Sequence, residues 1–365
     1  MIEKGKISNR QVMLLLVTSV LATGLLTFPS LTTAQAKQDA WLSVIIAAII
    51  GLTTILVTVS LGWRFPGKTI VEYSVDILGK IPGKVIGFIF VWFFFYLTAI
   101  VVREFSEFIV TVFMDNTPII VFISTILFAC AIAIYCGLEV IARVNEMMLT
   151  LVIISFLIFM SLAVGQMDLA RLTPVLAEGI IPVLKGAIPA AGWFGEVVTI
   201  AFLLPYINRP ELAKRAGIMS IFILCFLHSV GVVASIVVFG AEQTGRMQFP
   251  AFMVARNVSI AGTLERVEAL FMLIWVTGVF AKITIYYYVT VLAASQWLNL
   301  ISYKSLILPF GTVIGAMAVL NYVNNPELVS FIGKVWGPYS IPIELGIPVI
   351  LLIIAVIRRK GLKKG

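Results

Sequence analysis

Ten apolar stretches divide this sequence, each about 20 to 30 residues long and separated from the next by a short polar connection. A helix needs about 20 apolar residues to cross the hydrocarbon core of a bilayer. Backbone N–H and C=O groups in that core must be hydrogen-bonded within the protein, which favours helices. The predicted spans are 11–36, 41–62, 83–114, 117–135, 140–163, 185–205, 213–239, 267–297, 305–322 and 338–357.

The composition supports the same fold class. Hydrophobic residues make up 61% of the 365 residues, charged residues 12%, and the mean hydropathy is +1.08. These values are typical of a polytopic membrane protein. We therefore predict an all-α integral membrane protein in which residues 1–365 form a single transmembrane domain with ten transmembrane helices. The lipid bilayer is its expected surrounding.

The basic residues predict an orientation and no nucleic-acid partner. The net charge is +8, but Lys and Arg lie mostly in short loops and near the chain ends. With the N-terminus in the cytoplasm, 17 Lys and Arg residues lie on the inner side and seven on the outer side. The positive-inside rule then favours a multi-pass protein with both termini cytoplasmic.

The first predicted span contains two residues that interrupt a helix. Gly24 frees the backbone, and Pro29 lacks the N–H group that would continue the helical hydrogen bonds. We expect two half-helices joined by an unwound link, with a kink at Pro29 as the alternative. Irregular backbone at membrane depth is tolerated where it lines a cavity, so this interruption predicts a binding site.

The sixth predicted span is interrupted in a similar way, because Gly192 and Gly195 follow Pro189 near its middle. The first and sixth spans correspond if the chain holds two repeats of five spans, 11–163 and 185–357. Paired interrupted segments at matching positions point to a substrate site near the bilayer midplane in inverted-repeat transporters.

Residues at these two interruptions form the predicted ligand site. A helix N-terminus after the first interruption offers N–H groups to an anion, and carbonyls in the sixth span can accept from an ammonium group, which suits an amino acid zwitterion. Glu196 is the expected carboxylate partner of either a ligand ammonium or Lys282. The predicted ligand-binding residues are Thr23, Gly24, Leu25, Thr27, Gly192, Trp193, Phe194 and Glu196.

Lys282 lies near the middle of the eighth span and has no acidic residue within one turn. An isolated ammonium group at that depth needs backbone carbonyls or a distant carboxylate. Two interpretations are open. Lys282 either stands where a sodium ion binds in inverted-repeat transporters, or it braces the carbonyls of residues 23–28 without a role in transport.

A second group of charges, Arg103, Glu104 and Glu107, lies in the third span. Spacings of three and four residues place these side chains on adjoining helix faces, where they partly neutralise one another. A structural ion pair near the outer interface is one interpretation. A role in proton handling or gating is the other. Beyond these spans, the longest outer loop, 240–266, is predicted to be either a lid or a docking surface.

The sequence contains no enzymatic motif. One histidine cannot form a His-Glu-x-x-His zinc site, and no nucleophile elbow, phosphate loop or dinucleotide fingerprint is present. All four aspartates fall in loops or at the ends of spans. We therefore expect neither enzymatic activity, nor a metal site, nor a cofactor.

Three stretches carry a resemblance to a known family: the interrupted first helix, a cytoplasmic link, and the approach to the eighth span. They are Thr23-Gly24…Phe28-Pro29, Phe65-Pro66-Gly67-Lys68 to Leu78-Gly79-Lys80, and Arg256-Asn257-Val258…Leu264-Glu265-Arg266-Val267-Glu268…Trp275…Lys282. Together they resemble the B subunit of endospore germinant receptors, a branch of the amino acid–polyamine–organocation superfamily. The resemblance extends over nearly the whole chain.

This resemblance implies a LeuT-type five-plus-five inverted repeat with broken first and sixth helices. It also implies the inner membrane of a spore, assembly with an A subunit and a lipoprotein C subunit, and the sensing of a small nutrient germinant such as an amino acid. Proton-coupled, sodium-independent amino acid transporters share every feature described above, so transport is the alternative function.

Overall fold

The structure is a computed structural model that describes residues 3, 5–257 and 267–361. Val258 and Leu264, Glu265 and Arg266 of the family resemblance lie outside the described residues, as does the end of the loop 240–266. Within the described ranges the chain is helical, and its β-type pairing is limited to one bridge between Ile7 and Ile207. The all-α prediction is confirmed.

All ten predicted spans are present as helices. In the part of the chain that the structure describes, seven helical stretches are long and apolar enough to cross a membrane, and two shorter apolar helices accompany them. The first of the seven stretches contains two successive helices. They are α1 (Asn9–Ala36), α2 (Ala40–Arg64), α4 (Lys80–Val112), α5 (Ile119–Tyr135), α6 (Leu138–Leu162), α7 with α8 (Ile180–Tyr206), α9 (Ala213–Phe239), α12 (Val267–Trp297), α13 (Ile307–Leu320) and α14 to α16 (Asn325–Ile357). The last begins well before the predicted start at residue 338.

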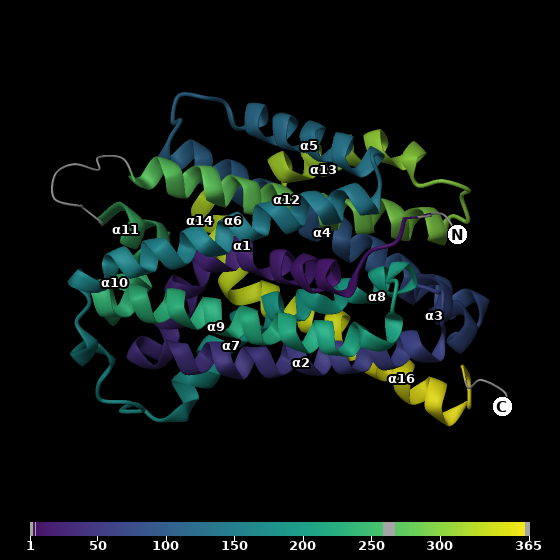
Figure 1. Ribbon diagram of the computed structural model, residues 1–365, viewed down its shortest axis with the longest axis horizontal. Helices are drawn as coiled ribbons and strands as arrows, with labels where there is room; N and C mark the ends of the chain where they lie inside the picture. The colour runs from purple at the N-terminus through teal and green to yellow at the C-terminus, as the bar shows by residue number, and fades with distance from the viewer. Residues whose placement is uncertain (1–2, 4, 258–266, 362–365) are drawn as a thin grey trace.

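α1 is one continuous α-helix that contains Pro29, so the predicted unwound link in the first span is wrong. Every residue from Leu14 to Ser30 is buried, since α1 lies in the middle of the bundle (Figure 1) and packs against α2, α6, α7, α9 and α12. Proline removes one helical hydrogen bond, and packing on all sides together with hydroxyl groups lets a buried helix tolerate that loss.

The sixth span does change its helical form where the sequence predicted an interruption. α7 (Ile180–Gly195) ends at Gly195 and is followed by a 3₁₀ turn, Glu196–Thr199, and the short helix α8 (Ile200–Leu203). A 3₁₀ stretch within a long helix often marks a hinge or a functional position. The last span contains two π-helical turns, Ile332–Trp336 and Pro342–Gly346, which the sequence reading did not predict.

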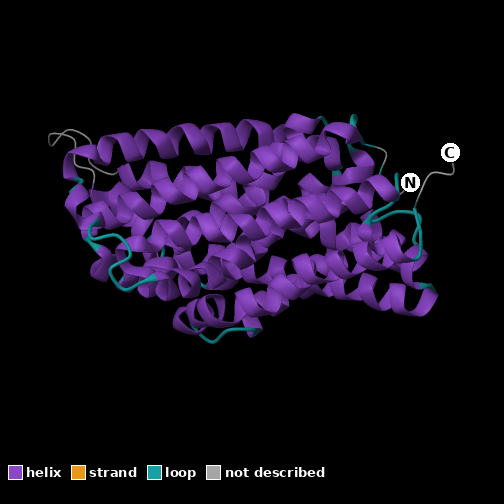
Figure 2. Ribbon diagram, turned by 90° about the horizontal axis from the view of Figure 1, so that it is seen from below, coloured by secondary structure: helices purple, strands orange, loops and turns teal. Residues whose placement is uncertain are grey.

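The helices run side by side along the long axis, and the loops gather mainly towards the two ends (Figure 2). α1 begins and α16 (Ile347–Ile357) ends at the same end of the bundle, near the short helix α3 (Ile70–Leu78) of the link 65–80 (Figure 1). Two short helices of the loop 240–266, α10 (Ala241–Arg246) and α11 (Pro250–Asn257), lie at the opposite end.

Candidate ligand site

Lys282 on α12 joins three parts of the bundle through its ammonium group. Nζ donates to Oε2 of Glu196 at 3.0 Å and to Oγ1 of Thr23 at 2.7 Å. The Lys282 and Glu196 side chains are 0% and 1% exposed. The two charges compensate each other in a space that water does not reach. Through Glu196 and Thr23, Lys282 connects α12 to the 3₁₀ turn after α7 and to α1.

Two aromatic side chains complete this network. The Tyr286 hydroxyl, one turn beyond Lys282, donates to Oε2 of Glu196 at 2.5 Å and also lies against the carbonyl of Ser19. The indole N–H of Trp193 donates to Oγ1 of Thr23 at 3.1 Å. Glu196 and Thr23 therefore each accept two hydrogen bonds, and both are held in fixed positions.

The predicted contact between Lys282 and backbone carbonyls of residues 23–28 is wrong. Because α1 is not unwound, those carbonyls remain largely within the helix, and the ammonium group bonds to side chains of Thr23 and Glu196 in their place. Of the two partners that the sequence allowed for Glu196, the structure pairs it with Lys282. That Lys282 occupies the position where inverted-repeat transporters bind a sodium ion stays a prediction.

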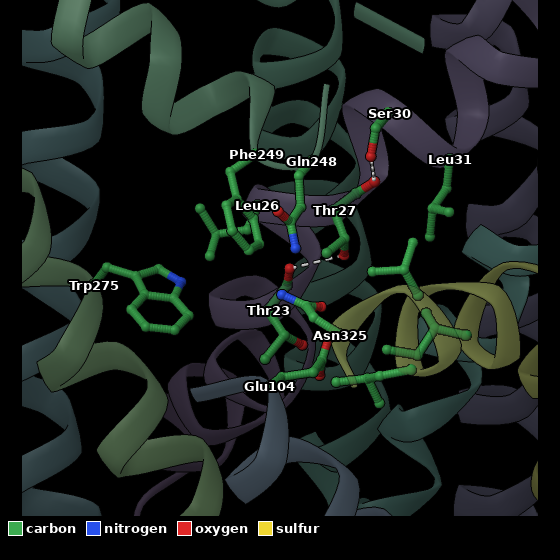
Figure 3. A pocket seen from close by; sticks show the side chains of 13 residues that line it. Thr23, Leu26, Thr27, Ser30, Leu31, Glu104, Gln248, Phe249, Trp275 and Asn325 are labelled. Carbon is green, nitrogen blue, oxygen red and sulfur yellow. Dashed lines mark hydrogen bonds between the residues drawn. The ribbon is translucent and has the colours of Figure 1, made fainter. Parts of the chain in front are cut away.

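A small cavity of about 20 Å³ adjoins Thr23. Figure 3 shows Thr23 and Thr27 of α1 on one wall, with Glu104 of α4 and the Gln248 and Asn325 side chains directed towards the same space. This volume holds about one water molecule, which is too little for an organic ligand. The remaining lining residues are Leu26, Ser30, Leu31, Phe249, Trp275, Leu328, Val329 and Ile332.

Glu104 is the charged residue of this cavity. It has no hydrogen bond or ion pair with any other residue in the described part of the chain, although Lys282 and Glu196 lie near enough to act on it electrostatically. The buried Nδ2 of Asn325 likewise lacks a partner among the described residues. An unpaired carboxylate and an unpaired amide donor therefore line the same small space.

The other two charges of the third span form a structural pair. Arg103 contacts the Glu107 carboxylate through Nη2 at 2.6 Å and Nε at 2.8 Å, and both side chains are largely buried. Its Nη1 donates at 3.0 Å to the carbonyls of Ala318 and Val319, near the end of α13. Arg103 and Glu107 thus connect α4 to α13 and do not reach the cavity.

Several predicted ligand residues face away from the cavity. A Cβ atom at Gly24 would overlap Nε2 of His228 on α9, and Leu25 also faces α9 at Gly231. Gly192 faces the last span, where Trp336 and Ser340 lie against it. These positions allow close helix packing. Phe194 is likewise a core residue, and its ring packs against those of Phe28 and His228.

A larger vestibule of about 870 Å³ lies above the cavity at the α10 end of the bundle. The two spaces share the residues Ser30, Leu31, Gln248, Asn325 and Val329. These side chains therefore separate the cavity from the vestibule. Lys185, Arg246 and Lys334 line the vestibule, and no acidic residue is among its described lining residues.

Sequence reasoning missed Gln248, Phe249 and Asn325 as lining residues. Gln248 and Phe249 lie in the outer loop, which had been predicted only as a lid or docking surface, and Asn325 precedes the predicted last span. No pattern in the sequence relates these residues to α1. Among the described residues, no group of three His, Cys, Asp or Glu side chains is placed to hold a metal ion.

Comparison with known proteins gives the family. A family profile described as "Spore germination protein" matches residues 6–326. The chain belongs to this spore germination protein family. Spore germination protein KB of Bacillus subtilis (strain 168) is 29% identical over 368 residues, covering 100% of this chain and 98% of the relative. Spore germination protein YndE of the same strain is 28% identical over 361 residues, covering 98% and 99%.

Solved structures give the fold. A crystal structure of MhsT in complex with L-phenylalanine aligns with a TM-score of 0.69 at 14% identity, covering 97% of this chain and 99% of that one. A Na⁺-coupled sialic acid symporter aligns with a TM-score of 0.67 at 13% identity, covering 95% and 79%. This spore germination family member therefore has the LeuT-type transporter fold, as predicted.

Proposed function

We propose that this chain is the germinant-sensing transmembrane subunit of a spore germination receptor, and that it binds a small nutrient in the cavity beside Thr23. The observation that carries the proposal is the position of Thr23. Its side chain lines the cavity and also accepts hydrogen bonds from Lys282 and Trp193. A ligand that contacts Thr23 therefore perturbs the hydrogen bonds that connect α1, α7 and α12.

The unpaired groups of the cavity favour an amino acid as the ligand. The Glu104 carboxylate suits the ammonium group, and the free amide donor of Asn325 suits the carboxylate. This assignment replaces the binding mode expected from the sequence, because a continuous α1 has no helix N-terminus at residues 24–29 to receive an anion. Thr23 and Thr27 keep their proposed role as contacts, whereas Gly24 and Gly192 act through helix packing.

Binding requires the cavity to enlarge. At about 20 Å³ it is closed, and the shared Gln248 and Asn325 side chains separate it from the vestibule. We propose that a ligand enters from the vestibule when these side chains and the loop carrying Gln248 move outwards. Lys185 and Lys334 of the lining attract molecules that carry a carboxylate, whereas Arg246 is paired with Glu242 at 2.7 Å.

The cellular context is part of the same proposal. The relatives named as spore germination proteins support the inner membrane of the spore as the location. The excess of Lys and Arg in alternate loops supports cytoplasmic termini. An A subunit and a lipoprotein C subunit are the proposed partners, on the basis of the family resemblance.

The proposal is tested with the Glu104→Gln variant. The purified protein in lipid nanodiscs is screened with the standard amino acids by thermal shift, and the variant is compared with Glu178→Gln, which alters an exposed carboxylate paired with Lys37. We expect at least one amino acid to raise the melting temperature of the wild type and of Glu178→Gln. Its affinity for Glu104→Gln should be lower by at least about tenfold. Unchanged affinity for Glu104→Gln refutes the proposed site.

A proton-coupled, sodium-independent amino acid transporter is the second candidate. The likeness to transporter structures and the buried ammonium group of Lys282 beside Thr23 favour it. Reconstitution into liposomes without partner subunits separates the two functions. A sensing subunit binds its ligand but shows little concentrative uptake, whereas accumulation driven by a pH gradient and unaffected by sodium identifies the transporter.

A further inference from the structure

Glu344 is a buried carboxyl group for which the site described above provides no role. Its side chain is 0% exposed, and neither of its oxygens has a hydrogen-bond partner in the described part of the chain. The Ser340 hydroxyl lies nearby on the same helix without forming a well-directed bond. Glu344 belongs to the π-helical turn Pro342–Gly346, and π turns within helices often mark functional positions.

The carboxyl group lies directly against the interruption of the sixth span. A Cβ atom at Gly195 would overlap Oε2 of Glu344, so only glycine at this position allows the two segments to approach. Gly195 ends α7, and Glu196 begins the 3₁₀ turn. Glu344 therefore touches the point at which the sixth span changes its helical form.

The charges around Glu344 do not balance if every group is ionised. The π turn packs against α2, α4, α15 (Gly337–Ile341), α16 and the 3₁₀ turn Glu196–Thr199. The ionisable residues on these elements are Arg64, Lys80, Lys84, Tyr96, Arg103, Glu104, Glu107, Tyr339 and Glu196. Glu196, together with Lys282 and Tyr286 of α12, lies near enough to Glu344 to act on it electrostatically.

One ammonium group, that of Lys282, thus lies among three carboxyl groups: Glu196, Glu344 and, on the cavity side, Glu104. Lys282 directs its ammonium to Glu196 and Thr23 and does not bond to Glu344. An ionised Glu344 carboxylate would have no cation bonded to it and only the poorly directed Ser340 hydroxyl beside it, which is strongly unfavourable. The close approach at Gly195 leaves no space for a metal ion with its ligands, whereas a proton needs no additional space.

We propose that Glu344 is a proton-binding site and carries a proton when the sixth span has the conformation seen here. A proton taken up from bulk solvent forms an O–H bond with one carboxylate oxygen, and Lys282, Glu196 and Glu344 together then hold one positive and one negative charge. Loss of this proton places a second negative charge beside Glu196, at the junction of α7 and the 3₁₀ turn. Proton occupancy therefore controls the conformation at this junction.

Infrared spectroscopy on the full-length protein in nanodiscs tests the proposal. A protonated carboxyl group gives a C=O stretching band, distinct from that of a carboxylate, which shifts in D₂O. At neutral pH we expect this band in the wild type and in the Glu178→Gln control, and its loss in Glu344→Gln. A neutral-pH spectrum in which Glu344→Gln removes only carboxylate absorption overturns the proposal.

The pH dependence of stability is the second readout. A proton held by the folded protein and released on unfolding lowers stability as pH rises, by about tenfold in the folding equilibrium constant per pH unit above about pH 4. We expect a pH-dependent melting temperature in the wild type and a weaker dependence in Glu344→Gln. Parallel profiles for the two proteins overturn the proposal.

If Glu344→Gln does not fold, the same infrared measurement is made on wild-type protein whose glutamate residues are isotopically labelled. Conversion of an acid band to carboxylate above neutral pH, accompanied by a falling melting temperature, supports the proposal. Absence of a glutamic acid band at neutral pH refutes it.

Discussion

Replacing Lys282 with methionine removes the ammonium group that joins α1, α12 and the sixth span. Methionine preserves most of the length and the apolar part of the side chain, so the variant reports charge more than packing. The Glu196 carboxylate is then left 1% exposed and retains only its bond to Tyr286. Removing one partner of a buried pair typically costs about 3–5 kcal/mol, because the remaining charge is uncompensated.

The control is Lys68→Met, which breaks a surface pair with Asp76 in which both side chains are more than a third exposed. Exposed pairs contribute about 0–1 kcal/mol, so this variant is expected to melt close to the wild type. Thermal denaturation in detergent or nanodiscs, followed by tryptophan fluorescence, measures both. We also expect that added sodium does not restore Lys282→Met, because no group of three His, Cys, Asp or Glu side chains among the described residues is placed to hold a metal ion.

A double variant separates loss of charge from loss of contact. Lys282→Met combined with Glu196→Gln removes both charges, so it is expected to be more stable than Lys282→Met alone. A Lys282→Met protein with wild-type melting behaviour would contradict this reasoning. So would a double variant that is no more stable than the single one, since the uncompensated carboxylate would then not be the source of the loss.

Two further predictions concern helix packing. Gly24→Ala should lower the melting temperature, because the added methyl group overlaps the His228 ring. Adding His228→Ala to this variant should recover part of the loss, because it makes room for the methyl group. Equal losses in the single and double variants would argue against this contact. Arg103→Met should also destabilise, by about 3 kcal/mol, because it leaves Glu107 unpaired and frees two α13 carbonyls. Arg103→Lys should retain only part of the stability that Arg103→Met loses, since one ammonium group cannot reproduce the guanidinium geometry. Wild-type stability in Arg103→Lys would show that charge alone matters.

The length and spacing of the apolar stretches were sufficient to predict the helical fold class and the existence of all ten spans, although the last span begins earlier than predicted. Hydropathy is a local property, because the transfer free energy of each side chain depends mainly on its own chemistry. The change of helical form at Gly195 and Glu196 was also readable from local glycines and proline. Glu196 as the partner of Lys282 was one of two options that the sequence allowed.

Tertiary structure decided the rest. Gly24 and Pro29 favour an interrupted helix locally, but α1 is enclosed by other helices, and packing outweighs the local preference. The contacts of Lys282 with Thr23 and Glu196, 259 and 86 positions away in sequence, depend on the rotation and axial offset of three helices. A hydrophobic pattern does not specify those two quantities when the helix surfaces are apolar on every side, which is why the cavity and the close approach of Glu344 to Gly195 became visible only in the folded bundle.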